Sequence, residues 1–281
     1  MIESNTGRTV ALARLKSALP ALREQYPHQR PFPFIVLENF LESACAERAM
    51  QDFPAANSDQ WLHYKHFNEN KLGLSKLELM PDSIARVIRE CSSEEFCEFL
   101  SELTGIPGLM PDPDLDGGGL HQSSRGGFLR VHTDFTTHPK HPHWQRRVNL
   151  LVYLNKDWLD SYGGHLEFWD AGMKGCEAKI APTFNRCVVF TTGTDTFHGL
   201  PHPMTCPEGM TRKSIALYYF TESSTAVSQS TFYKSLPEDS GLKSLLIRVD
   251  NFLLKIYSVL KRRCKLNDQL VSKFLKFFSR S

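Results

Sequence analysis

The hydrophobic and polar positions divide the chain into three stretches of different texture. Residues 1–125 contain segments in which apolar side chains recur at helical spacing, and residues 126–222 contain short apolar runs with the two-residue alternation of strands. Residues 240–281 return to helical spacing. The pattern predicts an α+β chain: an N-terminal helical and strand support region, a β-rich core, and C-terminal amphipathic helices.

The first stretch is expected to contain several helices, one buried strand and one long loop. The expected helices are 1–26, broken at Pro20, then Ser43 to about Phe53, Asp82 to about Cys91, and Ser93 to Gly105, with Ser43, Asp82 and Ser93 at helix starts. PFPFIVLENFL (31–41) is expected to form the strand. Residues 108–127, rich in Pro, Gly and Asp, are expected to be an irregular loop.

The second stretch contains six short β-prone runs separated by turn residues. They are 128–135, 146–155, 163–170, 177–184, 186–192 and 213–221. Strands that follow one another without intervening helices are typical of antiparallel sheets. The pattern therefore predicts an antiparallel barrel or jelly roll.

Composition narrows the class of protein without identifying a function. The chain has 281 residues, of which 41% are hydrophobic and 23% charged, as in ordinary globular proteins. It lacks an apolar run of the ~20 residues needed to span a membrane, and its first residues do not have the pattern of a secretory signal. Seven scattered cysteines without a C-x-x-C pair favour reduced thiols. These features predict a cytoplasmic location.

The third stretch differs from the rest in charge. Residues 240–281 contain ten Lys and Arg against two Asp, a balance of +8, while the other 239 residues hold 23 Lys and Arg against 29 Asp and Glu, a balance of −6. Its helical apolar positions are Leu242, Leu245, Leu246, Val249, Phe252, Leu253, Ile256, Tyr257 and Leu260. Such helices either pack on the core or across a dimer, or lie on an anionic membrane at its inner face. No nucleic-acid motif accompanies the charge.

The run GGFLRVHTDF (126–135) carries two side chains suited to metal binding. Alternate side chains of a strand share a face and lie roughly 7 Å apart along it, so Arg130, His132 and Asp134 point the same way. His132 and Asp134 are candidate metal ligands, with a solvated polar strand face as the alternative. Arg130 is expected either to form a salt bridge inside the barrel or to contact an anionic substrate.

A third ligand is expected from TGTDTFHGLPHP, which offers His198, with His202 as a competitor past the turn. Two imidazoles and one carboxylate form the facial triad that holds Fe(II) and leaves three coordination positions open. A keto acid can chelate through two of these positions and O₂ can take the third. The distal carboxylate of that acid needs a cation, and Arg212 with Ser214 on the same strand face could supply a guanidinium and a hydroxyl.

The segments HTD, VYLNKDW, GGHLEFW, FHGLPHP and TRKSIALYYF resemble the Fe(II)- and 2-oxoglutarate-dependent dioxygenases of the prolyl 4-hydroxylase-like group. YLNKDW is similar to a run in the hypoxia-inducible-factor prolyl hydroxylases. The resemblance covers residues 126–221 and implies a double-stranded β-helix core of the jelly-roll or cupin-like kind. It implies the following roles: His132, Asp134 and His198 as iron ligands, Arg212 as the 2-oxoglutarate anchor, and Tyr153 as the tyrosine whose hydroxyl assists that anchor. Asn149, on the same strand face as Tyr153, is a further candidate for the pocket.

The resemblance also implies the reaction class. Related halogenases replace the carboxylate ligand by a small residue, whereas Asp134 is retained here, so hydroxylation of an unactivated C–H bond with release of succinate and CO₂ is expected. Peptidyl proline, a small molecule, and a lipid-linked or lipopolysaccharide sugar such as Kdo are the candidate substrates. The alternatives are a non-catalytic jelly-roll binding module and a zinc-dependent cupin-like hydrolase. Self-association is left open.

Three more histidines, His138, His141 and His143, follow the strand of His132 closely. They are interpreted either as a second metal site or as an exposed Pro-rich loop over the mouth of the barrel.

Overall fold

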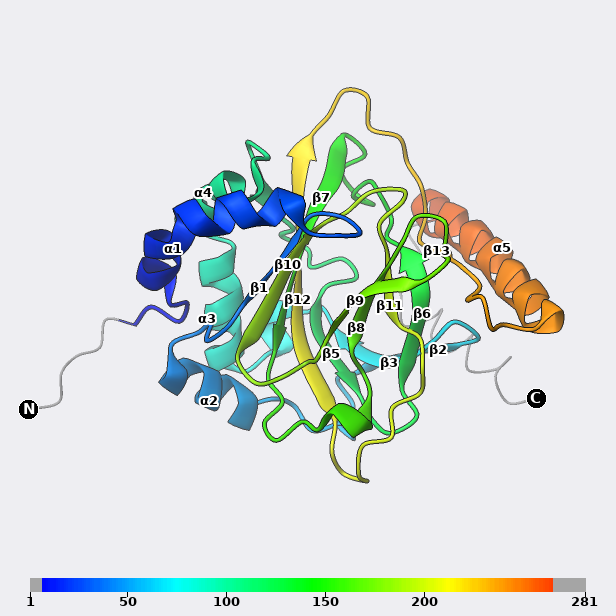
Figure 1. Cartoon of the computed structure of the whole chain (residues 1–281), viewed down its shortest axis with the longest axis horizontal. Coiled ribbons are helices and arrows are strands. Elements are labelled where there is room, and N and C mark those ends of the chain that lie inside the picture. Colours follow the sequence, from blue (N-terminus) through cyan, green and yellow to red (C-terminus); the bar gives the residue numbers. More distant parts are fainter. Residues whose placement is uncertain (1–6, 265–281) are drawn as a thin grey trace, which may run out of the picture.

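The computed structural model describes residues 7–264, with side chains to residue 256, and is built around a 13-stranded antiparallel sheet that curls on itself (Figure 1). The strands are β1 (Phe34–Leu37), β2 (Leu62–His66), β3 (Glu69–Leu74), β4 (Met110–Pro111), β5 (Gly119–Ser123), β6 (Phe128–Thr133), β7 (Trp144–Tyr153), β8 (Leu166–Trp169), β9 (Cys176–Ile180), β10 (Arg186–Thr191), β11 (Phe197–Leu200), β12 (Arg212–Glu222) and β13 (Phe232–Tyr233). The helices are α1 (Leu12–Gln25), α2 (Ser43–Gln51), α3 (Asp82–Cys91), α4 (Glu94–Thr104) and α5 (Gly241–Cys264). The predicted α+β jelly-roll fold is confirmed.

The order of the strands explains how residues far apart in sequence meet. The neighbours run β1-β10-β7-β12-β5-β3-β6-β11-β8-β9, and β13 pairs with β6 at one side. Strands from the first 125 residues, β1, β3 and β5, pair directly with strands from the later stretch. The β6–β11 pair brings together two segments that are more than sixty residues apart in sequence.

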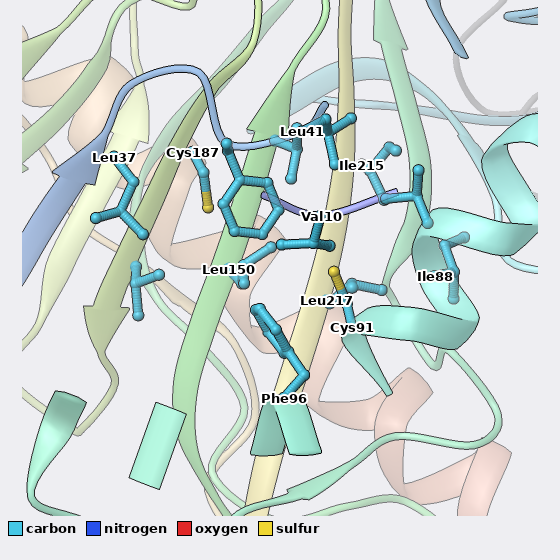
Figure 2. Packing of buried hydrophobic residues seen from close by; sticks show 14 of the residues in the cluster. Val10, Leu37, Leu41, Ile88, Cys91, Phe96, Leu150, Cys187, Ile215 and Leu217 are labelled. Atoms are coloured by element: carbon cyan, nitrogen blue, oxygen red, sulfur yellow. The ribbon is translucent and has the colours of Figure 1, made fainter. Parts of the chain in front are cut away.

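Alternation along β7 separates a helix-facing side from an interior side. Val148, Leu150 and Val152 belong to the large core under the helices, whereas Tyr153 belongs to a smaller cluster inside the curled sheet. Figure 2 shows the large core, where Leu150 and neighbouring strand residues pack against α3 and α4. Truncating a fully buried leucine such as Leu150 to alanine costs about 2–5 kcal/mol in cores of this kind. The apolar side of the sheet therefore fixes the backbone that carries the polar interior side.

The predicted start and end of α4 are confirmed, whereas predictions for α1 and α2 are partly wrong. Ser93 caps α4 by accepting a hydrogen bond from the Phe96 amide at 3.3 Å, and Gly105 ends α4 in the left-handed conformation, as predicted. The prediction that Pro20 breaks the first helix is wrong, because Pro20 lies inside α1. Its ring is on the exposed side, while Leu19 and Leu22 on either side of it pack against the large core and keep the helix in place. Ser43 is the first residue of α2 and makes no cap, since Glu42 occupies the capping position.

The expected irregular loop at 108–127 is also wrong in part, because it contains β4 and β5. Glycine makes this pairing sterically feasible: a Cβ on Gly119, whose φ is +87°, would lie 2.3 Å from the Leu74 carbonyl oxygen. The chain can therefore enter β5 between β3 and β12 where a larger residue would collide with the neighbouring strand.

Helix α5 lies apart from the other helices. Helices α1 to α4 cover one side of the sheet, and α5 lies at the other side, near β13 and β6 (Figure 1). Within residues 7–264 no helix is long and apolar enough to cross a membrane. The second part of the expected C-terminal helical region, 265–281, lies outside the described residues.

Candidate metal centre and co-substrate pocket

The candidate ligands come from two paired strands. His132 lies in β6, Asp134 follows the end of that strand, and His198 in β11 is the direct cross-strand partner of His132. The glycine after His198 permits this pairing, because a Cβ on Gly199 would lie 2.7 Å from the Leu129 carbonyl oxygen. Strand β11, which the sequence did not predict as a strand, thus brings the third side chain to the first two.

These three side chains form what we call the barrel cluster. One potential ligand atom from each of His132, Asp134 and His198 lies within 4.8 Å of the others, and all three residues are buried. His132 Nε2 is 3.6 Å from one carboxylate oxygen of Asp134, and His198 Nε2 is 3.4 Å from the other. The structure therefore brings together the three predicted ligands.

The direction of the hydrogen bonds shows which nitrogen atoms of the barrel cluster are free to bind a metal ion. His132 Nδ1 is 2.9 Å from the Arg130 carbonyl oxygen, and His198 Nδ1 is 3.0 Å from that of Thr196. A carbonyl oxygen only accepts, so both Nδ1 atoms carry the proton and, in the neutral rings, both Nε2 atoms present lone pairs to Asp134. Metal-binding histidines use this arrangement, with one nitrogen tied to a carbonyl and the other on the metal.

The charge states of the barrel cluster suit a divalent cation. Burial lowers the pKa of His198 to about 4, so this imidazole is neutral at pH 7. Burial alone would raise the pKa of Asp134, but Arg146 and the two histidines outweigh it and hold that pKa well below its usual range. A buried carboxylate facing two imidazole Nε2 atoms is the donor set of an Fe(II) facial triad. The residues present fit that metal.

Two side chains of β7 fix the orientation of the Asp134 carboxylate. Asn149 Nδ2 donates to Asp134 Oδ2 at 2.8 Å, and a guanidinium nitrogen of Arg146 lies 3.2 Å from the same oxygen. Arg146 Nε also donates to Asn149 Oδ1 at 2.9 Å, and its guanidinium carbon lies 3.4 Å from the centre of the Tyr218 ring. Asn149, predicted for the co-substrate pocket, thus contacts the candidate metal ligand Asp134.

Sequence reasoning missed Arg146, and the reason is a β-bulge. Tyr219 pairs with Val148 and Phe220 pairs with Arg146, so Arg147 is skipped in the ladder between β7 and β12. Simple alternation from Asn149 would place Arg147 inside the sheet and Arg146 outside. The bulge reverses this order and buries Arg146, which a single sequence does not signal.

Arg212 and Tyr153 form a buried cationic site. Arg212 Nε donates to the Gly164 carbonyl oxygen at 2.7 Å, and its guanidinium carbon lies 4.8 Å from the centre of the Tyr153 ring. Among residues 7–256, whose side chains are described, no carboxylate pairs with Arg212, and the buried Tyr153 hydroxyl interacts with the Arg212 guanidinium alone. Ser214 is buried directly across from Tyr153 in the β7–β12 ladder. These donors fit a carboxylate of an incoming acid.

Arg130 has a partner within the protein. Its guanidinium forms a buried ion pair with Asp239, the salt bridge that was one of the two expectations. Arg130 also lines a groove of about 450 Å³ together with His202 and Lys243. His202 therefore lies in the groove wall and does not belong to the barrel cluster. The substrate contact of Arg130 stays a prediction.

A second group, which we call the loop cluster, consists of Asp114, His138 and His141, whose potential ligand atoms also lie within 4.8 Å of one another. His138 Nδ1 accepts from the amides of Lys140 and His141, both at 3.1 Å, so its Nε2 carries the proton. That nitrogen lies 3.1 Å from Asp112 Oδ1. His138 is fully buried, so the interpretation of this region as an exposed loop is wrong for this residue.

The sequence of the core matches one protein family. Residues 118–220 match the model of the 2OG-Fe(II) oxygenase superfamily, in agreement with the resemblance of the motifs in this part of the chain. Members of the superfamily use Fe(II), 2-oxoglutarate and O₂, and the barrel cluster supplies the His and Asp side chains for such a metal. No curated protein sequence matches the chain.

The fold is similar to that of solved prolyl hydroxylases. The prolyl hydroxylase of Trichoplax adhaerens, in complex with a hypoxia inducible factor oxygen degradation domain peptide fragment, is 17% identical with a TM-score of 0.51, over 76% of this chain and 94% of that chain. A Pseudomonas putida prolyl-4-hydroxylase is 15% identical with a TM-score of 0.51, over 73% and 100%. One from Phytophthora capsici is 14% identical with a TM-score of 0.50, over 96% and 90%. At these identities the likeness shows the fold.

Proposed function

We propose that this protein is an Fe(II)- and 2-oxoglutarate-dependent dioxygenase that hydroxylates an unactivated C–H bond and releases succinate and CO₂. The observation that carries the proposal is the barrel cluster, in which two imidazole lone pairs converge on one ionised carboxylate. Arg212 and Tyr153 add a second, anion-binding site in the same curled sheet.

Each side chain has a definite role in this proposal. His132, Asp134 and His198 hold the ferrous ion, and Arg212 holds the distal carboxylate of 2-oxoglutarate with help from the Tyr153 hydroxyl. When bound, iron with the keto acid supplies the activation of O₂ that hydroxylation requires. Ser214, across from Tyr153, is a further candidate donor to that carboxylate.

The surrounding side chains orient the ligands and exclude water. Asn149 and Arg146 set the rotation of the Asp134 carboxylate through its Oδ2 atom. The ring of Tyr233 lies 5.3 Å from that of His132, and the ring of Phe190 lies 4.9 Å from that of His198. These aromatic walls keep solvent from the imidazoles.

We propose two substrate classes, each supported by its own observation. A lipid-linked or lipopolysaccharide sugar such as Kdo is anionic, and the groove beside β6 is lined by Arg130, His202 and Lys243 against one acidic residue, Glu238, although Arg130 and Lys243 also pair with Asp239. This class fits an enzyme that works in the cytoplasm at the inner face of the membrane. Peptidyl proline is supported by the likeness of the fold to prolyl hydroxylases.

A turnover screen tests the proposal. Purified protein is incubated with Fe(II), 2-oxoglutarate and O₂ and with prolyl peptides, free amino acids or lipid-linked sugars, and succinate and product mass are measured. The proposal expects succinate in step with a product heavier by one oxygen atom. Binding of 2-oxoglutarate without succinate for any substrate would indicate a binding module. Zinc-dependent hydrolysis that Arg212→Ala leaves unchanged would indicate a hydrolase.

A further inference from the structure

Helix α5 presents its apolar side chains to solvent. Among its apolar side chains that the structure describes, up to residue 256, seven are exposed, and we call them the α5 apolar face: Leu242 (69%), Leu245 (54%), Leu246 (41%), Val249 (48%), Phe252 (63%), Leu253 (56%) and Ile256 (42%). In contrast, Ile247 is buried with 1% exposure. At 100° per residue the seven positions fall within an arc of about 120°. An ordinary surface helix turns such an apolar arc toward the core, so the orientation of α5 is the opposite of the usual one.

The contacts that hold α5 to the body are largely polar. Asn251 accepts from the Tyr233 amide at 2.9 Å and donates to the Tyr233 carbonyl oxygen at 2.8 Å. Asp250 Oδ2 lies 3.0 Å from His66 Nδ1, and Lys243 lies 2.6 Å from Asp239. These bonds fix the rotation of the helix about its axis. The apolar face is therefore held outward by specific hydrogen bonds and ion pairs on the opposite side.

Charge indicates what covers this face. Arg248 and Lys255 are exposed at one border of the arc, and the one acidic residue of α5, Asp250, is paired with His66. Residues 240–281 carry a balance of +8 against −6 for the remainder. A second copy seated on the same face would bring two such basic segments together, which costs free energy. Anionic lipid headgroups instead neutralise the charge while the acyl boundary takes the apolar side chains.

We infer that the α5 apolar face binds the surface of an anionic membrane, with Arg248 and Lys255 at the headgroups. The helix lies flat on the lipid, with the side that carries Ile247, Asp250 and Asn251 still bound to the protein. Long basic side chains at the border of an apolar face reach the headgroup level in this orientation. The inference does not depend on turnover or on the identity of the substrate.

Sedimentation of the full chain with lipid vesicles tests the inference. We expect binding to vesicles of mixed phosphatidylglycerol and phosphatidylcholine, and weak binding to phosphatidylcholine alone. Leu245→Ser with Leu253→Ser should lower the partition coefficient by roughly tenfold or more. Arg248→Glu with Lys255→Glu should lower it by about tenfold, and added salt should do the same.

A matched variant controls for the loss of exposed apolar surface. Leu79→Ser with Leu159→Ser changes two leucines that are 41% and 55% exposed elsewhere, and it should leave vesicle binding unchanged. All these substitutions are at exposed positions, and unchanged thermal unfolding will show that the variants fold.

Three results would overturn the inference. One is equal sedimentation of the wild type and of the Leu245→Ser, Leu253→Ser variant. Another is a dimer in light scattering that dissociates with this variant while vesicle binding is absent, which would make the face an interface between copies. The last is binding that appears only after residues 265–281 are removed, which would show that this segment covers the face.

Discussion

The barrel cluster and the loop cluster look alike by proximity and differ in the direction of their hydrogen bonds. Both bring a carboxylate and two imidazoles to within 4.8 Å. In the barrel cluster, His132 and His198 each donate Nδ1–H to a backbone carbonyl, which leaves Nε2 lone pairs directed at the carboxylate. In the loop cluster, His138 accepts two backbone amides at Nδ1 and donates from Nε2 to Asp112.

Proximity alone therefore does not define a metal site. A neutral imidazole has one lone pair, and in His138 the backbone amides already occupy it. Asp112, its partner, accepts amides from Asp114 and Asp116 at 2.8 and 2.7 Å, so the loop cluster closes a turn. The barrel cluster instead turns two imidazole lone pairs toward a carboxylate that Arg146 and Asn149 keep ionised, so all three donors remain available to a metal ion.

Substituting one histidine in each cluster should change the rate of succinate formation very differently. His198→Ala removes one imidazole lone pair and should lower succinate formation by roughly a thousandfold or more. His141→Ala in the loop cluster should leave the rate within about twofold, because that residue stacks on Trp144 at 4.2 Å. The rates are measured at saturating Fe(II) and 2-oxoglutarate. Similar losses in both variants would remove the distinction.

The cation beside the barrel cluster should bind the co-substrate. Arg212→Ala should weaken 2-oxoglutarate binding by about a hundredfold, because a charge-assisted pair is worth about 3 kcal/mol. Tyr153→Phe should weaken it by about tenfold or less. Calorimetry with the Mn(II)-loaded protein measures both effects. Arg125→Ala, a surface cation bonded to the Thr205 carbonyl oxygen, serves as the control, and equal behaviour of Arg212→Ala and Arg125→Ala would contradict the assignment.

Substitution of Asn149 tests whether the orientation of the Asp134 carboxylate affects metal binding. Asn149→Ala removes the hydrogen bond to Asp134 Oδ2 and should weaken metal binding by about 10- to 100-fold. Titration with Mn(II), followed by electron paramagnetic resonance, measures the affinity. An unchanged affinity would mean that Arg146 alone sets the position of Asp134.

The loop cluster should matter for stability. His138→Ala leaves the buried Asp112 carboxylate without its imidazole donor and should lower the free energy of unfolding by roughly 2 kcal/mol. Urea denaturation at neutral pH measures this change. The account would be contradicted if the variant lost metal binding while its stability stayed the same.

His66 gives a third histidine environment, whose effect on stability depends on pH. Burial opposes its charge, but hydrogen bonds to Asp250 and Glu69 outweigh burial and raise the pKa of His66 to about 9. A raised folded-state pKa stabilises the protein fully below the unfolded value of about 6.5, and this stabilisation is lost as the pH rises through 9. Urea denaturation at about pH 6 and about pH 10 should show a loss of roughly 1–3 kcal/mol. His66→Gln should flatten this dependence, and the same slope in the variant would rule out His66 as its source.

The sequence predicted the site better than it predicted the strands around it. The two-residue spacing placed His132 and Asp134 on one face because strand geometry is local, and the curl of the sheet brings His198 opposite His132. The buried position of Arg146 depends on a bulge at Arg147, which only the pairing with β12 reveals.

Long-range contacts explain the other misses. Strand β5 was hidden in a glycine-rich segment whose regular structure comes from its neighbours β3 and β12. The outward face of α5 was equally invisible, because helical spacing shows that an apolar face exists and does not show where it points. The first half of the chain supplied fewer local signals, and β2 and β3 were missed altogether.

Anomalous diffraction from crystals of the Mn(II)-loaded protein would locate the metal ion. We expect one strong manganese peak at about 2.0–2.3 Å from His132 Nε2, His198 Nε2 and an Asp134 oxygen. A peak between Asp114, His138 and His141, or a manganese ion bound without His198, would contradict it.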